Sequence, residues 1–299
     1  MSAILDSLAA SPASTLAPSA RPLPATRPLP ARPLPARPLP AAGGTRLARG
    51  VLDNATLVDR LDLTAGLAIF TIRPDGGPLR FQPGQYVSLA LRVDGSPVLR
   101  PYSIASPDDG RADFELLIRR ADDGALTSRL WALDPGARLF VGPPRGVFTV
   151  LADDAREHLL VGAGTGLAPL MAMLARLAER QHPPRTVLLH GASHATELAY
   201  AQRLRAWADQ GWLDYRPSVS RPEDAESAGW RGLVGRIDVQ LERALAEPAR
   251  APGDMVAYLC GNDGMVRGAR ELLAGAGVPP SATHAESFTP ARRAPGVAA

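Results

Sequence analysis

The middle of the chain holds a short apolar run that ends in a cluster of glycines. Residues His158–Val161 have the length and the continuous apolar character of a buried strand. The stretch Gly162–Pro169 follows at once, and a helix pattern runs from about 167 to 180. A strand, a glycine turn and a helix form a βα unit, in which the helix N-terminus offers amides to a phosphate. The spacing here, G-x-G-x-G, is a variant of the usual dinucleotide pattern.

The sequence after this unit alternates between strand and helix patterns. We expect strands at 186–190, 213–219 and 255–260, and helices at 197–210, 237–245 and 263–274. Such alternation is typical of a mainly parallel sheet with helices on both faces. We therefore expect an α/β domain over residues 153–288.

The sequence before this unit, from about Thr45 to Val150, shows short strand patterns instead. We expect strands at 66–72, 86–91, 114–118, 138–141 and 146–150, separated by turns rich in glycine and proline. Strands at this spacing favour a small antiparallel barrel or sandwich. We place this β domain at residues 45–152.

The segment Arg100–Ser106 lies between two of these strands and gathers an arginine, an aromatic ring and hydroxyls. The Arg100 guanidinium offers a planar fork for a phosphate. The Tyr102 ring can stack on a flat heterocycle, and Ser103 can donate a hydrogen bond to a ring nitrogen. A phosphorylated aromatic cofactor suits this set. An edge strand with polar side chains and a proline near its start fits the same residues equally well.

One predicted helix interrupts the strands. Residues 129–133 form its body, and Thr127 or Ser128 is the expected N-cap. The free amides at a helix N-terminus form an anion site, although an ordinary capped helix is the commoner case. A pyrophosphate that bridges this turn and Arg100 would need both features.

Basic residues follow a strand end in the α/β half. Ser220 and Arg221 come after the strand at 213–219, and Arg236 precedes the helix at 237. Nucleotides bind at the carboxyl ends of such strands, so two arginines here suit a ribose 2′-phosphate. Two solvated arginines among 33 basic residues is the competing interpretation. Cys260 ends another strand and is either a plain buried thiol or part of a nicotinamide pocket.

Length and composition exclude several classes of protein. The chain has 299 residues, 45% of them hydrophobic, which is enough for two domains with proper cores. We find no apolar run of about 18 residues and no basic start before an apolar core, so we expect neither a membrane span nor a secretory signal. The single cysteine excludes an internal disulfide or a multi-thiolate iron–sulfur cluster and favours a cytoplasmic protein.

Positive charge is concentrated near the N-terminus. The first 50 residues carry six arginines and one acid, whereas the rest carry 27 arginines and 29 acids, so we expect no nucleic-acid partner. Arg-Pro-Leu-Pro recurs at Arg21, Arg27, Arg32 and Arg37. This composition favours polyproline II or disorder over residues 1–44. We favour a solvated spacer over a ligand for a proline-binding module or an organelle-targeting segment.

Three motifs in this order resemble the ferredoxin–NADP reductase family: Arg100-Pro-Tyr102-Ser103, Gly162-x-Gly164-Thr165-Gly166-Leu-Ala-Pro169 and Cys260-Gly261-Asn262. A Gly124-x-Leu126-Thr127 turn lies between the first two. The third motif, extended to Met265, is most similar to bacterial ferredoxin/flavodoxin reductases. The resemblance covers about Thr45 to Phe288, and its motifs are jointly specific.

The resemblance implies an antiparallel Greek-key barrel that binds FAD, followed by a Rossmann-like domain that binds NADP(H). Arg100 would face the flavin phosphate, Tyr102 would stack on the isoalloxazine, and Ser103 would lie near flavin N5. Residues of the intervening turn would hold the pyrophosphate: Gly124, Leu126 and Thr127.

In the second domain, the resemblance implies a nicotinamide-nucleotide site lined by Gly162, Gly164, Thr165 and Gly166. Cys260 would lie beside the nicotinamide, next to Gly261, so that Ser103 and Cys260 are the implied catalytic residues. The positions that match a 2′-phosphate site are Ser220, Arg221 and Arg236.

Two departures from the family pattern bear on the site. Bacterial relatives often have an arginine in the loop after the second strand of the nucleotide domain, where this chain has Ser193 and His194. Many members end in a tyrosine or tryptophan that covers the flavin. Here Glu286-Ser-Phe288, similar to the Glu-x-Phe ending of oxygenase reductases, precedes eleven more residues. Phe288 is the candidate covering ring, and we expect residues 289–299 to be a flexible C-terminus.

The resemblance implies hydride transfer between NADPH and FAD and single-electron exchange with ferredoxin or flavodoxin, which would be the partner protein. Two alternatives stay open: the flavin reductase component of an oxygenase system, and a non-catalytic scaffold with a degenerate reductase fold. The five histidines show no metal-ligand spacing, so we predict no metal site and assign them no catalytic role. We also expect a monomer.

Overall fold

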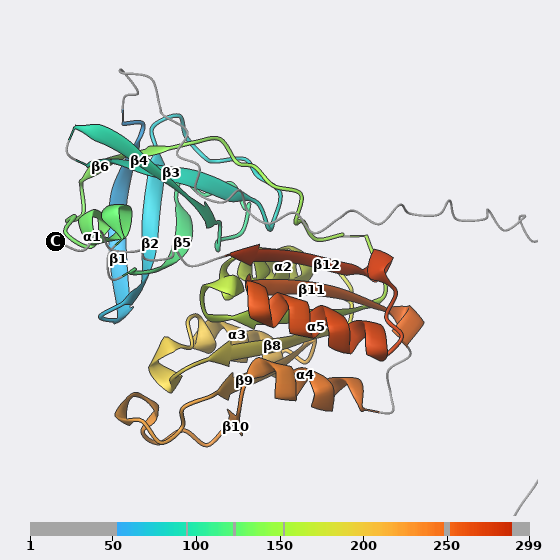
Figure 1. The fold of residues 1–299 in the computed structure, drawn as a ribbon. Coiled ribbons are helices and arrows are strands. Elements are labelled where there is room, and N and C mark those ends of the chain that lie inside the picture. The colour runs from blue at the N-terminus through green and yellow to red at the C-terminus, as the bar shows by residue number, and fades with distance from the viewer. Residues whose placement is uncertain (1–52, 94, 122–123, 152, 248–251, 289–299) are drawn as a thin grey trace, which may run out of the picture. The chain divides into compact units, whose positions relative to one another are not determined.

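A computed structural model gives the fold and describes residues 53–93, 95–121, 124–151, 153–247 and 252–288 (Figure 1). The expected tail at 1–44 and the expected C-terminus at 289–299 lie outside the described residues. The described part has an antiparallel half followed by a parallel half, which confirms the predicted fold class. None of its helices has the length and apolar character needed to cross a membrane.

The first half is a six-stranded antiparallel sheet. Its strands are β1 (Ala55–Thr64), β2 (Leu67–Pro74), β3 (Tyr86–Val93), β4 (Ser96–Ser103), β5 (Phe114–Arg119) and β6 (Arg138–Val141). The spatial order is β4-β3-β6-β1-β2-β5, a Greek-key arrangement in which β6 lies between β3 and β1. The two edge strands meet where Ile104 bridges Leu116 and the Ala105 amide donates to the Glu115 carbonyl at 2.8 Å. The sheet therefore closes into the predicted barrel.

Alternate side chains of the strands fill the barrel. Phe114, Leu116 and Ile118 of β5 are all buried in its core. The short helix α1 (Ala125–Leu130) adds Leu126 and Leu130 to the same core. This packing fixes the strand register, so that the polar residues on the opposite faces of β4 and β5 have defined positions.

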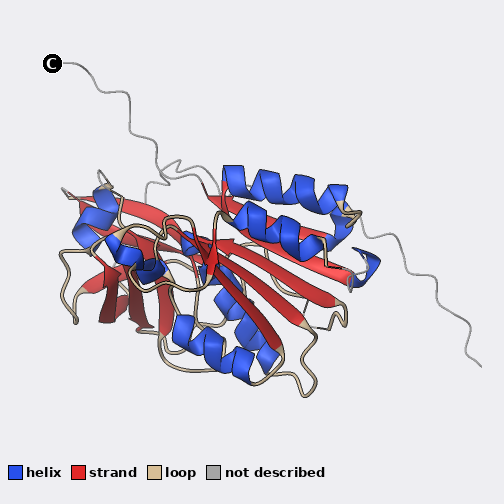
Figure 2. Cartoon of the chain, turned by 90° about the horizontal axis from the view of Figure 1, so that it is seen from below, coloured by secondary structure: helices blue, strands red, loops and turns tan. Residues whose placement is uncertain are grey.

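The second half is a six-stranded parallel sheet. In spatial order its strands are β10 (Leu233–Val234), β9 (Leu213–Val219), β8 (Thr186–Ala192), β7 (Glu157–Ala163), β11 (Met255–Asn262) and β12 (Thr283–Phe288). Its two faces are covered by α2 (Leu167–Ala178), α3 (Ala201–Asp209), α4 (Ile237–Leu245) and α5 (Asp263–Gly275) (Figure 2). Leu160 of β7 shares a core with Leu170 of α2, and Leu159 shares the other core with Leu241 of α4. The Rossmann-like domain is therefore confirmed.

Four local predictions are wrong. The helix expected at 129–133 is α1, which begins at Ala125 and ends at Leu130. Residues 146–150 form no strand, because Gly146 has a φ of +115° and turns the chain. The helix expected at 197–210 begins at Ala201, after the 3₁₀ turn η2 (Ala195–Glu197) and after Tyr200, whose φ is 57°. The N-cap of α1 is Gly124 in place of Thr127 or Ser128, and no described side chain caps it.

The connection between the halves is anchored on the parallel sheet. The Leu151 amide donates to the Tyr258 hydroxyl at 2.9 Å. The Tyr258 ring stacks with His158 and with His284, at centroid distances of 5.9 and 5.1 Å. Burial lowers the pKa of both histidines, so they are neutral packing groups at neutral pH.

Candidate active site

Strand β4 carries the arginine and the tyrosine of the first motif at one edge of the barrel sheet. Arg100 and Tyr102 alternate with Pro101, so they project from the same face of the strand. Both are partly buried. Burial raises the pKa of Tyr102, and the nearby Arg100 charge opposes that rise. Arg100 Nη1 donates to the Leu99 carbonyl at 2.7 Å, and no described carboxylate pairs with the guanidinium, so its other donors are available to an anion.

Helix α1 packs against β3 and β4, which brings the turn at Gly124–Thr127 beside the first motif. The Thr127 hydroxyl accepts from the Ala121 amide at 3.1 Å and lies 3.3 Å from the carbonyl oxygens of Ala121 and Gly124. The Leu126 side chain is buried in the barrel core. These side chains hold the turn together, so a ligand would be bound by backbone amides of the turn.

The glycine turn after β7 brings its backbone very close to β11. A Cβ on Gly166 would lie 2.1 Å from the Cys260 carbonyl oxygen, and one on Gly162 would lie 2.8 Å from Leu170 Cδ1. Gly164 opens the 3₁₀ turn η1 (Gly164–Gly166) with a φ of +56°, in the left-handed region that glycine adopts most easily. Thr165 is partly exposed in this turn. The turn therefore presents mainly backbone at the carboxyl edge of the sheet.

Cys260 lies at this edge, in register with Gly162 on β7 and with Glu286 on β12. Only 2% of Cys260 and 5% of Glu286 is exposed. Burial raises the pKa of the Cys260 thiol well above its ordinary value, and the Glu286 charge raises it further, so the thiol is protonated at neutral pH. Burial also raises the pKa of Glu286 to about 7. Its Oε1 has no hydrogen-bond partner among the described residues.

The residues after Cys260 complete the edge. Gly261 is buried, and the Asn262 side chain caps α5 by accepting from the Met265 amide at 3.0 Å. Phe288 pairs with Asn262 in register and is partly buried against the core that contains Cys260. The candidate covering ring therefore lies at the last position of β12.

The residues predicted for the 2′-phosphate lie on the surface beyond β9 and are all exposed: Ser220, Arg221 and Arg236. The Ser220 amide donates to the Ala192 carbonyl at 3.1 Å, and the Arg221 amide donates to the Ser193 carbonyl at 2.9 Å. Arg236 is the N-cap of α4, and its side chain lies 3.4 Å from Asp238. The structure therefore joins Ser220 and Arg221 to the loop after β8, whereas Arg236 lies at the start of α4.

The two halves contribute to one buried cluster near Cys260. Ala105, which follows Ser103 by two residues, shares this cluster with Leu117 of β5, Leu167 of α2 and Cys260. The segment that carries the first motif and the strand end that carries the third motif are therefore parts of the same core.

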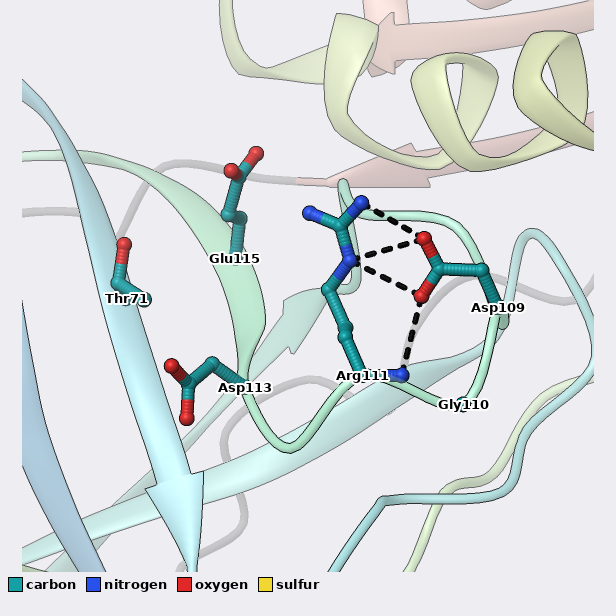
Figure 3. A pocket seen from close by; sticks show the side chains of 6 residues that line it. All are labelled: Thr71, Asp109, Gly110, Arg111, Asp113 and Glu115. Carbon is teal, nitrogen blue, oxygen red and sulfur yellow. Dashed lines mark hydrogen bonds and ion pairs between the residues drawn. The ribbon is translucent and has the colours of Figure 1, made fainter.

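A surface cavity of about 590 Å³ lies on the barrel, and none of the motif residues lines it (Figure 3). Its wall includes Glu115 and two carboxylates that arginines already hold, Asp109 by Arg111 and Asp113 by Arg73, each at 2.6 Å. An acidic wall repels a phosphate, so this cavity is no candidate for either nucleotide.

Comparison with known proteins divides the chain in the same way. Residues 54–150 match the oxidoreductase FAD-binding domain, and residues 160–271 match the oxidoreductase NAD-binding domain. The chain is 34% identical over 220 residues to ferredoxin–NADP reductase B of Sorangium cellulosum, which covers 72% of this chain and 88% of that protein. The chain belongs to the ferredoxin–NADP reductase family.

Reductases of other systems are also similar to this family member. The stachydrine N-demethylase reductase subunit Stc4 of Rhizobium meliloti is 30% identical over 221 residues, which covers 72% of this chain and only 60% of that longer relative. The crystal structure of the Amycolatopsis cytochrome P450 reductase GcoB has a TM-score of 0.69 at 28% identity and covers 80% of this chain and 70% of that one. The chain is thus an oxidoreductase with an FAD-binding half and a nicotinamide-nucleotide-binding half.

The donor set fits these two nucleotides. Arg100 keeps free donors beside the Tyr102 ring, and the approach of the Gly166 backbone to Cys260 leaves no room for a Cβ. Sequence analysis assigned no role to Glu286. The feature that identifies Glu286 is its pairing with Cys260 across β11 and β12. That pairing could not be found from the sequence, which did not predict β12.

Proposed function

We propose that this reductase transfers hydride between NADPH and FAD and exchanges single electrons with ferredoxin or flavodoxin. The observation that carries the proposal is the shared core that joins the segment after Ser103 to Cys260. FAD, when bound, takes up two electrons as a hydride and releases them singly. The contribution of the chain is to bind, orient and shield the two nucleotides.

In the barrel half, Arg100 would bind a flavin phosphate through its free donors, and Tyr102 would offer its ring for stacking. The backbone amides at Leu126 and Thr127 would bind the other phosphate. Ser103 would donate a hydrogen bond to the flavin ring, and Phe288 would cover it. The free guanidinium donors and the packing of α1 on β4 support these roles.

In the parallel half, the turn from Gly162 to Gly166 would line the nicotinamide-nucleotide site. Cys260 would contact the nicotinamide as a neutral, polarizable thiol, with Gly261 beside it. Glu286 would hold or release a proton next to this thiol, because its pKa is about 7. The 2′-phosphate would be bound by exposed residues after β9 and before α4: Ser220, Arg221 and Arg236.

The identity of the bound flavin tests the arrangement of two phosphate sites. We expect heat to release non-covalent FAD, because the turn at Gly124–Thr127 provides a second phosphate site that a mononucleotide would not need. Chromatography of the released cofactor distinguishes the outcomes. FMN alone would contradict the two-site arrangement, and a colourless protein would favour the non-catalytic scaffold.

The coenzyme preference tests the 2′-phosphate site. Each lost hydrogen bond to a charged group costs about 1.5–3 kcal/mol, so Arg221→Ala should raise the KM for NADPH roughly 10- to 150-fold. The KM for NADH should change much less. The kcat should also change less, because a phosphate remote from the hydride binds alike in the ground and transition states. An equal loss with both coenzymes would contradict the assignment.

The reductase component of an oxygenase is the second candidate function. The similarity to Stc4 and the Glu286-x-Phe288 ending favour it. Steady-state turnover with purified ferredoxin and flavodoxin separates the two candidates. We expect NADPH-dependent reduction of one of these carriers. Failure to reduce either, together with efficient use of NADH, would favour the oxygenase system.

We further infer that the protein acts in the cytoplasm as a monomer, without a nucleic-acid partner. The only cysteine is buried, which disfavours a disulfide between copies, and the charge after residue 50 is nearly balanced. Light scattering after gel filtration measures the mass, and fractionation of cells measures the location. A stable dimer or a membrane-bound fraction would contradict this inference.

A further inference from the structure

A buried carboxylate joins the barrel to the loop that follows β8. Arg119, the last residue of β5, donates from Nη1 to Glu197 Oε1 at 2.8 Å across 78 residues of sequence. Glu197 is only 9% exposed. Burial raises the pKa of Glu197, but the hydrogen bond and the charge of Arg119, with smaller contributions from Ser193 and His194, lower it by more, so the net pKa lies below its ordinary value. A buried carboxylate that is ionised needs this partner.

The same carboxylate holds the loop after β8. Glu197 Oε2 accepts from the Ser193 amide at 3.2 Å, and Glu197 Oε1 lies 3.9 Å from His194 Nδ1. His194 Nε2 lies 2.9 Å from Asp224 on the next loop. The Glu197 side chain therefore contacts Arg119 of the barrel and two consecutive residues, Ser193 and His194, of its own loop.

This loop in turn holds the segment that carries Arg221. The Ser193 carbonyl accepts from the Arg221 amide at 2.9 Å, and the Ala192 carbonyl accepts from the Ser220 amide at 3.1 Å. The Ala195 amide donates to the buried Ser227 hydroxyl at 3.2 Å. A continuous series of hydrogen bonds therefore runs from Arg119 to the backbone of Arg221.

A strained backbone conformation at Tyr200, three residues after Glu197, is a second observation in this segment. Among the described residues, Tyr200 is the one non-glycine with a positive φ, 57°. Such a conformation is unfavourable for a non-glycine residue and persists where the surroundings demand it. Tyr200 directly precedes α3, and Arg203 of α3 lies 3.8 Å from Glu115 of β5. The segment after β8 is thus held against β5 at two points.

We propose that Arg119 and Glu197 are positioning residues for the coenzyme: the barrel, through this ion pair, fixes the loop that places Ser220 and Arg221. Neither residue needs to touch the coenzyme. The inference deepens the proposed function and rests on it, because it assumes that Arg221 binds the 2′-phosphate. A simple ion pair between the halves would instead contribute to stability alone.

Arg119→Ala tests the proposal against that simpler role. Breaking a coupled contact of this kind changes binding by roughly 0.5–2 kcal/mol, so the Kd for NADP⁺ and the KM for NADPH should rise about 2- to 30-fold. The kcat and the flavin content should stay within about twofold, because the hydride site is unchanged. Arg120→Ala, at the neighbouring exposed position, is the matched control and should leave all four quantities unchanged.

The double variant Arg119→Ala/Glu197→Gln separates positioning from stability. Arg119→Ala alone leaves a buried carboxylate unpaired and should lower the melting temperature. Removing that charge as well should restore much of the melting temperature while the Kd for NADP⁺ stays high. Arg119→Lys, which keeps a donor and a charge, should recover part of the affinity.

Calorimetric measurement of NADP⁺ binding to the purified holoprotein distinguishes failure of the positioning inference from failure of the proposed function. If wild type binds NADP⁺ and Arg119→Ala binds it equally well, the positioning inference is overturned and the proposed function stands. The same holds if affinity recovers in the double variant together with stability. If wild type binds neither NADP⁺ nor NADPH, the proposed function is overturned and this inference with it.

Discussion

The first motif of the barrel and the glycine turn of the parallel sheet present different groups to a ligand. In the first motif the expected phosphate donor is a side chain: Arg100 lies on an edge strand and bonds only to the neighbouring Leu99 carbonyl within the described chain. In the glycine turn the group presented is backbone: a Cβ on Gly166 would lie 2.1 Å from the Cys260 carbonyl oxygen, so no side chain fits there. Substitution in the barrel site should therefore remove binding and spare the fold, whereas substitution in the sheet site should disturb the fold itself.

Gly166→Ala should have the largest effect. The new Cβ would lie 2.1 Å from the Cys260 carbonyl oxygen, so the turn after β7 and strand β11 would have to move apart. We expect a loss of about 3 kcal/mol in the free energy of unfolding, the upper end for overpacking. Urea unfolding measures this loss.

Gly164→Ala is the matched control for this prediction. Nothing lies within 4 Å of a Cβ at Gly164, so only its φ of +56° opposes the change. Adopting that conformation costs an alanine about 1 kcal/mol. If the two variants lost equal stability, the close approach at Gly166 would not be the cause.

Arg100→Ala should weaken FAD binding and leave the apoprotein almost as stable as before. Loss of one charge-assisted hydrogen bond costs about 1.5–3 kcal/mol, which is roughly a 10- to 150-fold rise in the Kd for FAD. Titration of the apoprotein with FAD, followed by flavin fluorescence, measures the affinity. Arg73→Ala, another barrel arginine that pairs with Asp113, is the control and should bind FAD normally. A large fall in apoprotein stability for Arg100→Ala would contradict the expectation that substitution in the barrel site spares the fold.

The same contrast explains what the sequence could predict. The glycine turn from Gly162 to Gly166 is local, because its residues and the helix that follows are adjacent in sequence, and the strand–turn–helix unit was predicted from it. The fold class followed from the pattern of strands and helices along the chain and from the family resemblance. The N-cap of α1 was predicted wrongly. A threonine hydroxyl often caps a helix, but the Thr127 hydroxyl here accepts from the Ala121 amide instead. Local propensity gave no sign of that contact.

Contacts between residues that are far apart in sequence could not be predicted from local patterns. Glu286 meets Cys260 only through the pairing of β11 with β12. Arg119 meets Glu197 across 78 residues. β10 has only Leu233 and Val234, too few for a detectable period. Such contacts depend on strand order, which a single sequence does not specify.

Glu286→Gln should have a smaller effect that depends on pH. The pKa of Glu286 is raised from 4.5 to about 7 by burial, so between these values the unfolded chain releases a proton that the folded chain keeps. Wild-type stability should therefore fall relative to the variant as pH rises, by about 2 kcal/mol between about pH 5 and pH 7. Urea unfolding of both proteins over this range gives the difference and cancels the histidines that titrate in both. A difference that stays flat with pH would contradict the raised pKa of Glu286.

Rapid anaerobic mixing of the purified flavoprotein with NADPH tests most directly whether the two halves form one working site. The visible absorbance of the bound flavin reports its reduction. We predict fast bleaching by NADPH, slower bleaching by NADH at the same concentration, and recovery of the absorbance when oxidised ferredoxin or flavodoxin is added. Bound FAD that neither coenzyme bleaches would contradict the account, because the barrel and the sheet would then hold their nucleotides without bringing them together.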